Sequence, residues 1–440
     1  MLVTMIFQTL YFLIDLYWIG RLGREAVAAV SIAGNLTFIV LALSQMLGVG
    51  TTALISHAVG QKDKARALLI FNQAQLLSLV AGVLFLAVGM ALRRPYVDAL
   101  AADAVTADLA SDFLGWFIPA MALQFGLVAL GAALRGTGNF KPGMVVGTGT
   151  VILNMLLAPF LIFGWGTGVA FGVAGAAVSS FIAVLVGVAW MATYFLSSGS
   201  YLRFALRDWK PQGHLWAALL KIGLPAGTEF ALMAVYLFIV YVITRPFGAA
   251  AQAGFGIGLR IVQAGFMPIV ALGFGVAPVA GQNFGARRPE RVRRAFQDAA
   301  WMAAGTMAAF AALCLFAPRP MVAFFSSDPA VIAVGEEYLR ILAWSFIGSG
   351  VIFVTSSTFQ ALGNSVPPLL TSVARIVVVA VPALVLSGMA AFELRWIWYL
   401  SASAILLQMA LNLILLRREF ARKLNFAAAP LAVQPDTIEA

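Results

Sequence analysis

Apolar runs of about 20 residues, the length of a membrane-spanning helix, follow one another along the chain between short polar loops. A spanning segment must satisfy its backbone hydrogen bonds internally, as a helix does, and the alternating ten-residue strands of a barrel are absent from the sequence. The chain of 440 residues is 62% hydrophobic, which is more apolar surface than a soluble protein of this size could bury. We therefore predict an all-α integral membrane protein in contact with the lipid bilayer.

The apolar runs form two sets of six on either side of a polar, basic connector at 198–222. The first set lies near 1–19, 30–58, 67–92, 113–134, 143–163 and 173–197, and the second near 223–244, 251–282, 296–317, 338–361, 368–389 and 395–416. This division predicts an N-terminal six-helix lobe at 1–197, a C-terminal lobe at 223–416 and a partly disordered cytoplasmic tail at 417–440. The connector is the natural hinge. The first run is short for a crossing, so we expect a cytoplasmic leader to precede it.

The two sets are related by a tandem repeat, in which equivalent positions differ by a constant offset of 225 in residue number. Glycines and loop residues, which coincide by chance less readily than aliphatic residues, match at this repeat offset. The pairs include Gly48 and Gly273, Gly50 and Gly275, Gly60 and Gly285, Arg66 and Arg291, and Gly138–Asn139 and Gly363–Asn364. Six spans per half return the chain to the same side, so we predict twelve transmembrane helices in two parallel six-helix repeats, related by an axis along the membrane normal.

Lys and Arg are distributed unevenly between the two sides of this topology. The even-numbered loops and the tail carry 18 of them, and the odd-numbered loops carry 8. The positive-inside rule therefore predicts that both termini are cytoplasmic in a multi-pass protein of the cell inner membrane. The net charge of +10 resides mainly in these short loops, so it indicates orientation and not binding of nucleic acid.

The sequence offers little for metal, redox or catalytic chemistry. A single cysteine, Cys314, excludes an intrachain disulfide, and the presence of only two histidines makes a His-rich metal site implausible. A Gly-rich phosphate loop, an HExxH motif and a clustered Asp motif are also missing. We therefore predict no metal, no cofactor and no enzymatic activity, and the sequence favours transport.

Four ionisable residues lie inside the predicted spans: Asp15, Glu229, Arg260 and Arg375. A charge at the centre of a bilayer costs about 3 kcal/mol on insertion scales, so such a residue is expected to face a cavity or a partner and is a functional candidate. We interpret both arginines as structural, because their long side chains can reach a counter-ion or the membrane interface.

Asp15, late in the first span, is the main candidate for cation coupling, since a carboxyl there can carry a proton, bind a cation or alternate between them. Asn154 in the fifth span and Ser179 and Ser180 in the sixth are expected to line a polar patch with it, although such residues also serve as contacts between helices. Glu229, early in the seventh span, is either a second candidate or only a favourable charge near a helix N-terminus.

Five segments resemble motifs of the multidrug and toxic compound extrusion (MATE) family of transporters. Within this family, the sequence most resembles the DNA-damage-inducible-type prokaryotic branch. The five segments are DLYWIGRLG at 15–23, GTTALISHAVGQKDKARA at 50–67, LRGTGNFKPGM at 134–144, NMLLAPFLIFG at 154–164 and GVAGAAVSS at 172–180. With the twelve spans and the two-half pattern, the resemblance covers essentially the whole chain. It implies two six-helix lobes that form a V around a central cavity.

The resemblance also implies a function and a set of residues. It implies a monomeric antiporter that exports amphipathic, often cationic drugs or metabolites from the cytoplasm by alternating access, with H⁺ or Na⁺ as the coupling ion. By position, Asp15, Asn154 and Ser180 match the cation cluster of this branch, with Ser180 in place of a threonine. The acid that usually follows four residues after the asparagine is Ala158 here. Glu229 lies nearer the start of its span than the seventh-span acid of the other large prokaryotic branch.

Two other functions compete with this hypothesis. A flippase for lipid-linked or polysaccharide precursors, from the same superfamily, would carry extra spans or a strongly basic central cavity. The twelve apolar runs and the two arginines within them disfavour a flippase. An integral membrane enzyme is disfavoured by the missing catalytic motifs.

Overall fold

The computed structural model describes residues 18–19, 21–101, 103–166, 168–197, 200–387 and 392–426, most of which are helical. Within these residues, eleven helices are long and apolar enough to cross a membrane. The first predicted span, at 1–19, lies almost entirely outside the described residues, and so does Asp15. The prediction of an all-α membrane protein is confirmed.

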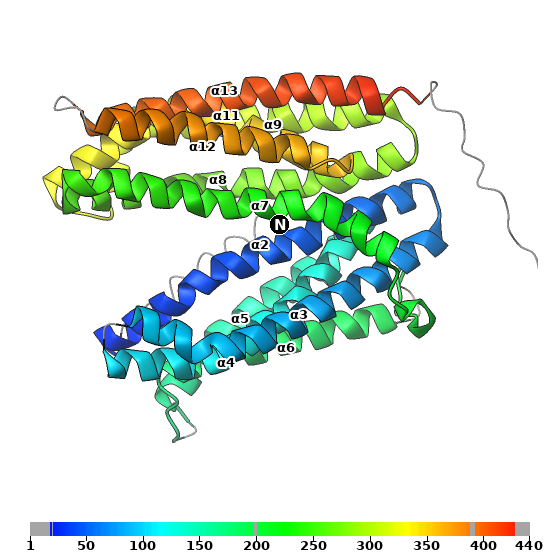
Figure 1. Ribbon diagram of the computed structural model, residues 1–440, viewed down its shortest axis with the longest axis horizontal. Coiled ribbons are helices and arrows are strands. Elements are labelled where there is room, and N and C mark those ends of the chain that lie inside the picture. The colour runs from blue at the N-terminus through cyan, green and yellow to red at the C-terminus, as the bar shows by residue number, and fades with distance from the viewer. Residues whose placement is uncertain are drawn as a thin grey trace, which may run out of the picture.

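The helices divide into two lobes, coloured blue to teal and green to red in Figure 1. The N-terminal lobe contains α2 (Arg24–Gly60), α3 (Lys64–Leu100), α4 (Ala104–Thr137), α5 (Lys141–Phe163) and α6 (Val173–Leu196). The C-terminal lobe contains α7 (Gly213–Thr244), α8 (Ala249–Gly285), α9 (Pro289–Phe316), the short α10 (Pro318–Ala323), α11 (Pro329–Ala361), α12 (Val366–Ser387) and α13 (Leu394–Lys423). Two short 3-10 helices, η1 (Leu206–Trp209) and η2 (Arg245–Phe247), lie in the loops on either side of α7.

The tandem repeat is visible in the helix boundaries. Both ends of α8 lie at the repeat offset from the ends of α2, and α9, α11 and α12 begin at the same offset from the first residues of α3, α4 and α5. The equivalent helix is central in each lobe, because α4 packs against α2, α3 and α6 while α11 packs against α8, α9 and α13. The main apolar core of the C-terminal lobe is separate from the two cores of the N-terminal lobe, one of which also includes Leu215 and Leu219 from the start of α7. The prediction of two parallel repeats is confirmed.

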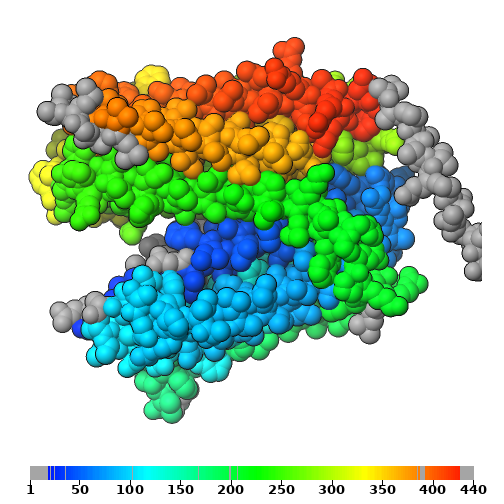
Figure 2. All heavy atoms as spheres, in the orientation of Figure 1, coloured from blue at the N-terminus to red at the C-terminus, as the bar shows by residue number. Residues whose placement is uncertain are grey.

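The two ends of the molecule differ in how closely the lobes approach each other. We call one end the basic end; it carries the loops at 61–63, 138–140, 286–288 and 362–365 and the connector between the lobes. We call the other end the open end, because Figure 2 shows a cleft between the lobes on that side. The cleft narrows toward the basic end, where the lobes touch, so the molecule has the predicted V shape.

Helix α2 closes the V by packing its C-terminal half against α7 and α8 of the other lobe. Glycines at this contact face backbone so closely that no Cβ would fit. The facing pairs of α2 and α7 are Gly50 and Leu219, Met46 and Gly223, and Ala42 and Gly227. Because these positions recur every four residues on both helices, one face of each helix forms the whole contact. We call this contact, together with that between α2 and α8, the seal.

The part of the seal between α2 and α8 is symmetrical. A Cβ at Gly60 would collide with the backbone of Gln282, and a Cβ at Gly285 would collide with the backbone of His57. These two pairs exchange when each residue number is shifted by the repeat offset. A self-complementary contact of this kind is what a two-fold axis produces.

Two hydrogen bonds across the lobes follow the same symmetry. Nε2 of His57 lies 2.6 Å from the carbonyl oxygen of Ala361. Nε2 of Gln282 donates to the carbonyl oxygen of Gly136 at 2.9 Å. His57 and Gln282 are equivalent in the repeat, and so are Gly136 and Ala361. The pseudo-two-fold axis therefore runs through the seal, as expected for parallel repeats.

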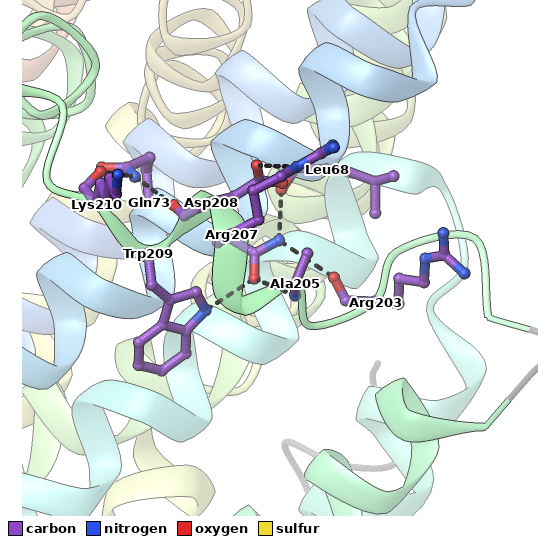
Figure 3. Close-up of polar contacts among 9 residues, drawn as sticks. Leu68, Gln73, Arg203, Ala205, Arg207, Asp208, Trp209 and Lys210 are labelled. Carbon is purple, nitrogen blue, oxygen red and sulfur yellow. Dashed lines mark hydrogen bonds and ion pairs between the residues drawn. The ribbon is translucent and has the colours of Figure 1, made fainter.

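The connector is attached to the N-terminal lobe by two buried amide side chains of α3 (Figure 3). Oδ1 of Asn72 accepts hydrogen bonds from the backbone N–H of Ala205 at 2.9 Å and from Nε1 of Trp209 at 3.0 Å. Nδ2 of Asn72 donates to the carbonyl oxygen of Arg203 at 3.2 Å. A buried backbone needs such partners where it forms no regular structure.

The neighbouring Gln73 continues this attachment. Its Nε2 donates to the carbonyl oxygens of Asp208 at 2.6 Å and Lys210 at 2.7 Å, and its Oε1 accepts from the backbone N–H of Gln212 at 3.0 Å. Residues 203–212 are thus held against α3. The start of α7, just beyond Gln212, is where the chain passes to the other lobe.

We expect Gly223→Ala to loosen the seal, because its new Cβ would overlap the backbone of Met46. Overpacking of this kind costs about 1–3 kcal/mol. The measurement is maleimide labelling of Ala53→Cys, a buried position between the lobes, with reagent added only on the side of the basic end. Labelling should be faster in the Gly223→Ala background. Gly275→Ala is the control, since a Cβ there meets nothing within 4 Å. Equal labelling in both backgrounds would contradict the role of the glycine contact.

We expect Asn72→Ala to release the connector, because it leaves two buried N–H donors without their acceptor, at about 1–3 kcal/mol. Limited trypsin digestion should then cut at Arg203 and Arg207 faster than in the wild type. Asn283→Ala is the matched control, since Nδ2 of Asn283 donates within its own helix, to Val279. Unchanged cleavage in Asn72→Ala would show that the connector is held by other contacts.

Candidate functional site

A polar cluster in the N-terminal lobe joins two of the predicted site residues. Nδ2 of Asn154 on α5 donates to Oγ of Ser180 on α6 at 2.9 Å. Oγ of Ser179 lies 3.4 Å from Oδ1 of Asn154 and also bonds the backbone of its own helix. All three side chains are buried. The predicted patch therefore exists, whereas the placement of Asp15 beside it stays a prediction.

A second polar cluster lies in the C-terminal lobe around Glu229 of α7. Oε1 of Glu229 accepts hydrogen bonds from Oγ of Ser356 on α11 at 3.2 Å and from Oγ of Ser372 on α12 at 3.3 Å. Nε2 of Gln408 on α13 donates to Oγ of Ser372 at 3.0 Å. Three helices thus meet at one carboxylate, and α13 joins them through Ser372; the side chains of Ser356, Ser372 and Gln408 are buried.

The depth of Glu229 differs from the sequence interpretation. Helix α7 begins at Gly213, within the predicted connector, so Glu229 is not at a helix N-terminus. Its distance from Gly213 in the sequence places Glu229 about 24 Å along the helix axis, at about 1.5 Å per residue. A carboxylate at that depth cannot be explained by the helix dipole, whose effect is confined to the first turn.

Arg375 belongs to the surroundings of Glu229. Its guanidinium carbon lies 5.3 Å from the centre of the Tyr236 ring, within the range of a cation–π contact. Oη of Tyr236 donates to Oγ of Ser401 at 2.8 Å. The positive charge of Arg375 also acts electrostatically on both Glu229 and Tyr236. Arg375 therefore faces the polar interior of the lobe and not the membrane interface.

The cluster around Glu229 is suited to a small cation or a proton. The carboxylate supplies charge, and the two serine hydroxyls can donate to it or turn their oxygens to a ligand. Oε1 of Gln408 is buried and has no hydrogen-bond partner among the described residues, so one more oxygen is available nearby. No group of three or more His, Cys, Asp or Glu side chains gathers anywhere in the described part of the chain.

A small cavity between the lobes is the third polar feature. Its volume is about 20 Å³, and it lies where α2, α4, α8 and α11 meet, next to the seal. It is lined by Gln45, Gly48, Val49, Thr52, Ala53, Arg135, Gly273, Phe274, Ala277, Ser357, Gln360 and Ala361. Four pairs in this lining are separated by the repeat offset: Gly48 and Gly273, Val49 and Phe274, Thr52 and Ala277, and Arg135 and Gln360. The cavity therefore lies on the pseudo-two-fold axis.

The structure brings together Asn154 and Ser180 but places Glu229 in the other lobe, so the predicted site residues form two separate clusters. Sequence reasoning missed Ser356, Ser372 and Gln408, which surround Glu229. The hydroxyl-rich stretch TSST at 355–358, in the middle of the tenth predicted span, was the available signal. It also missed the position of Arg135, which it counted only as a loop charge.

Comparisons with known proteins agree with this architecture. The chain is 24% identical over 372 residues to a FAD transporter of Shewanella oneidensis, a match that covers 84% of this chain and 82% of the relative. It is 26% identical over 369 residues to the multidrug export protein MepA of Staphylococcus haemolyticus, covering 83% of this chain and 80% of the relative.

Solved structures show the same fold. The structure superposes with a TM-score of 0.88 on the outward-facing conformation of a multidrug resistance MATE family transporter of the MOP superfamily. The two chains are 25% identical, and the match covers 96% of this chain and 94% of the other. The sequence model of the MatE family matches residues 1–160 and 225–386, which are parts of both lobes. This chain is therefore a member of the MatE family of membrane transporters.

Proposed function

We propose that this protein is a cation-coupled antiporter that exports amphipathic small molecules from the cytoplasm by alternating access. The observation that carries the proposal is the cleft between two pseudo-symmetric lobes, which is open at one end and sealed at the other. A pathway closed at one end cannot conduct as a channel does. It supports instead a carrier in which the lobes rock about a fixed site, as parallel-repeat transporters do.

The orientation follows from the loop charges. The basic end carries the even-numbered loops, so by the positive-inside rule it is cytoplasmic, and both termini lie on that side. The cleft then opens away from the cytoplasm. The seal is the cytoplasmic closure of an outward-open state, and its parting would give access from the cytoplasm. Since one chain supplies both lobes, the proposed transporting unit is a monomer.

Coupling requires a cation and a substrate that favour different states of the same two lobes. Glu229 supports such a role because its carboxylate contacts α11 and α12, which move against α7 only if these bonds change. Asp15 is the second candidate, with Asn154 and Ser180 as its proposed partners. The coupling ion is H⁺ or Na⁺, since both suit a carboxylate surrounded by hydroxyl and amide oxygens.

The substrate class is less constrained than the transport mode. The relatives bear the names of multidrug export proteins and of a FAD transporter, so their names do not point to one substrate class. The family resemblance favours amphipathic, often cationic drugs or metabolites. Export of lipid-linked precursors is the alternative, and the pattern of twelve apolar runs, without extra spans, disfavours it.

The test of coupling compares Glu229→Gln with Asp15→Asn in proteoliposomes loaded with ethidium, with a proton or a sodium gradient imposed separately. Neutralising the coupling carboxylate should lower gradient-driven efflux about tenfold or more, because the variant cannot exchange the cation. Ethidium binding in the absence of a gradient should change little. Glu337→Gln, on α11, is the control and should transport like the wild type.

The result assigns the coupling site. Loss of efflux in Glu229→Gln alone places coupling in the C-terminal lobe, and loss in Asp15→Asn alone places it in the N-terminal lobe. Wild-type efflux in both variants under both gradients would contradict cation-coupled antiport through either carboxylate.

A further inference from the structure

Arg135 belongs to the last turn of α4, but its guanidinium is directed into the protein. A Cβ built on Gly131, one turn earlier, would lie 3.6 Å from Nη1 of Arg135, and one built on Gly48 of α2 would lie 3.6 Å from Nη2. The guanidinium carbon is 5.3 Å from the centre of the Phe274 ring on α8, in the other lobe. The side chain therefore lies between the lobes and lines the interlobe cavity.

The charge of Arg135 has no counter-ion among the described residues. None of the side chains that line the cavity is acidic. No hydrogen bond or ion pair joins the guanidinium to another described residue; its identified contact is the cation–π contact with Phe274. The other polar side chains of the lining are the amides of Gln45 and Gln360 and the hydroxyls of Thr52 and Ser357, all of which can donate hydrogen bonds.

A purely structural role explains this placement poorly. An arginine in the last turn of a helix can stabilise the helix dipole, but it does so near the exposed carbonyls of the helix end. Here the guanidinium lies beside Gly131, on the side away from that end. The repeat offers an internal comparison, because the equivalent position on α11 is Gln360 and that helix also forms. The fold itself does not require a charge at this position.

We propose that Arg135 binds the anionic group of a small aromatic substrate at the bottom of the cleft. The planar guanidinium matches the geometry of a carboxylate or phosphate and can bind either in a bidentate manner. The cavity of about 20 Å³ has room for a group about as large as one water molecule, such as a single anionic oxygen. The aromatic body of the substrate would lie in the cleft above, next to Phe274.

This inference rests on the proposed transport function and specifies its substrate class. An unpaired positive charge on the axis between the lobes attracts anions and repels cations, so anionic or zwitterionic amphiphiles are favoured over the cationic ones expected from the family resemblance. Each anion that binds also supplies the counter-charge that the described residues lack. Charged groups in membrane proteins are expected to be matched in this way.

The test measures binding to the purified full-length protein in a neutral detergent with no gradient, so it is independent of coupling. The two probes are flavin mononucleotide and riboflavin, which share an aromatic ring system and differ by a phosphate. We expect the wild type to bind flavin mononucleotide about tenfold more tightly, because charge-assisted hydrogen bonds are the strong ones. Arg135→Gln should abolish this difference and leave riboflavin binding unchanged. Arg135→Lys keeps the positive charge but loses the planar guanidinium, so it should restore part of the preference for flavin mononucleotide.

Arg260→Gln is the matched control, since Arg260 lies on α8 within a span but is exposed and does not line the cavity. It should keep the full preference for flavin mononucleotide. Three results would overturn the proposal: equal binding of the two flavins by the wild type, a preference that survives in Arg135→Gln, or displacement of flavin mononucleotide by phosphatidylglycerol at lipid levels that leave riboflavin bound. The last result would mean that Arg135 binds the headgroup of a lipid and not a substrate.

The binding result separates this inference from the proposed antiport. A phosphate preference that depends on Arg135 supports the site even if no gradient drives efflux of any probe. Gradient-driven efflux by a wild type that binds both flavins equally would leave the antiport in place and remove the anionic site.

Discussion

The close approach of α2 to α7 and α8 is the contact on which the arrangement of the lobes depends. Glycines let the backbones meet where any Cβ would overlap the partner, as at Gly223 and Met46. Inside a membrane, helices associate through close packing and not through a hydrophobic driving force, so such contacts supply much of the attraction between lobes. The same contact is easily parted, because few polar bonds cross it. The bonds from His57 and Gln282 are two that do cross, and both lie at the basic end. A seal of this kind fits the proposed alternating access, in which the lobes would separate at the basic end.

The polar and charged side chains between the helices do not follow the two-fold symmetry that relates the helices of the two lobes. The contact between α2 and α8 repeats between the two halves. By contrast, Glu229 and its serine partners have no equivalent in the described part of the N-terminal lobe, where Gly131 and Gly147 lie opposite Ser356 and Ser372 in the repeat. Arg135 likewise pairs with Gln360. Because a symmetric fold does not need a charge on one side, these departures mark the positions where function is the better explanation. Two clusters in separate lobes also mean that a cation and a substrate need not share one site.

The structure changes the meaning of two charged residues. Glu229 looked like a helix-end charge because the apolar run begins near residue 223, whereas α7 starts earlier, at Gly213, in a polar, Pro-containing stretch. Hydropathy marks where a helix enters the membrane and not where it starts. Arg135 counted correctly toward the basic side, since α4 does end there. Its side chain, however, points back along the helix, as Cβ vectors do, and this carries the charge between the lobes.

The sequence by itself determined the spanning helices, their pairing into two parallel halves and the basic side, because length, periodic repetition and loop charge are properties of segments along the chain. It also placed Asn154 and Ser180 in one polar patch, because both are polar residues within apolar spans and both match the cation cluster of the family that the sequence resembles. Only the tertiary structure decided which residues meet from distant segments: Ser356 and Ser372 with Glu229, His57 with Ala361, and Arg135 with Phe274. The physical reason is that hydropathy fixes the depth of a residue in the membrane, whereas its rotation about the helix axis and the partner it faces depend on backbone packing between helices far apart in the chain.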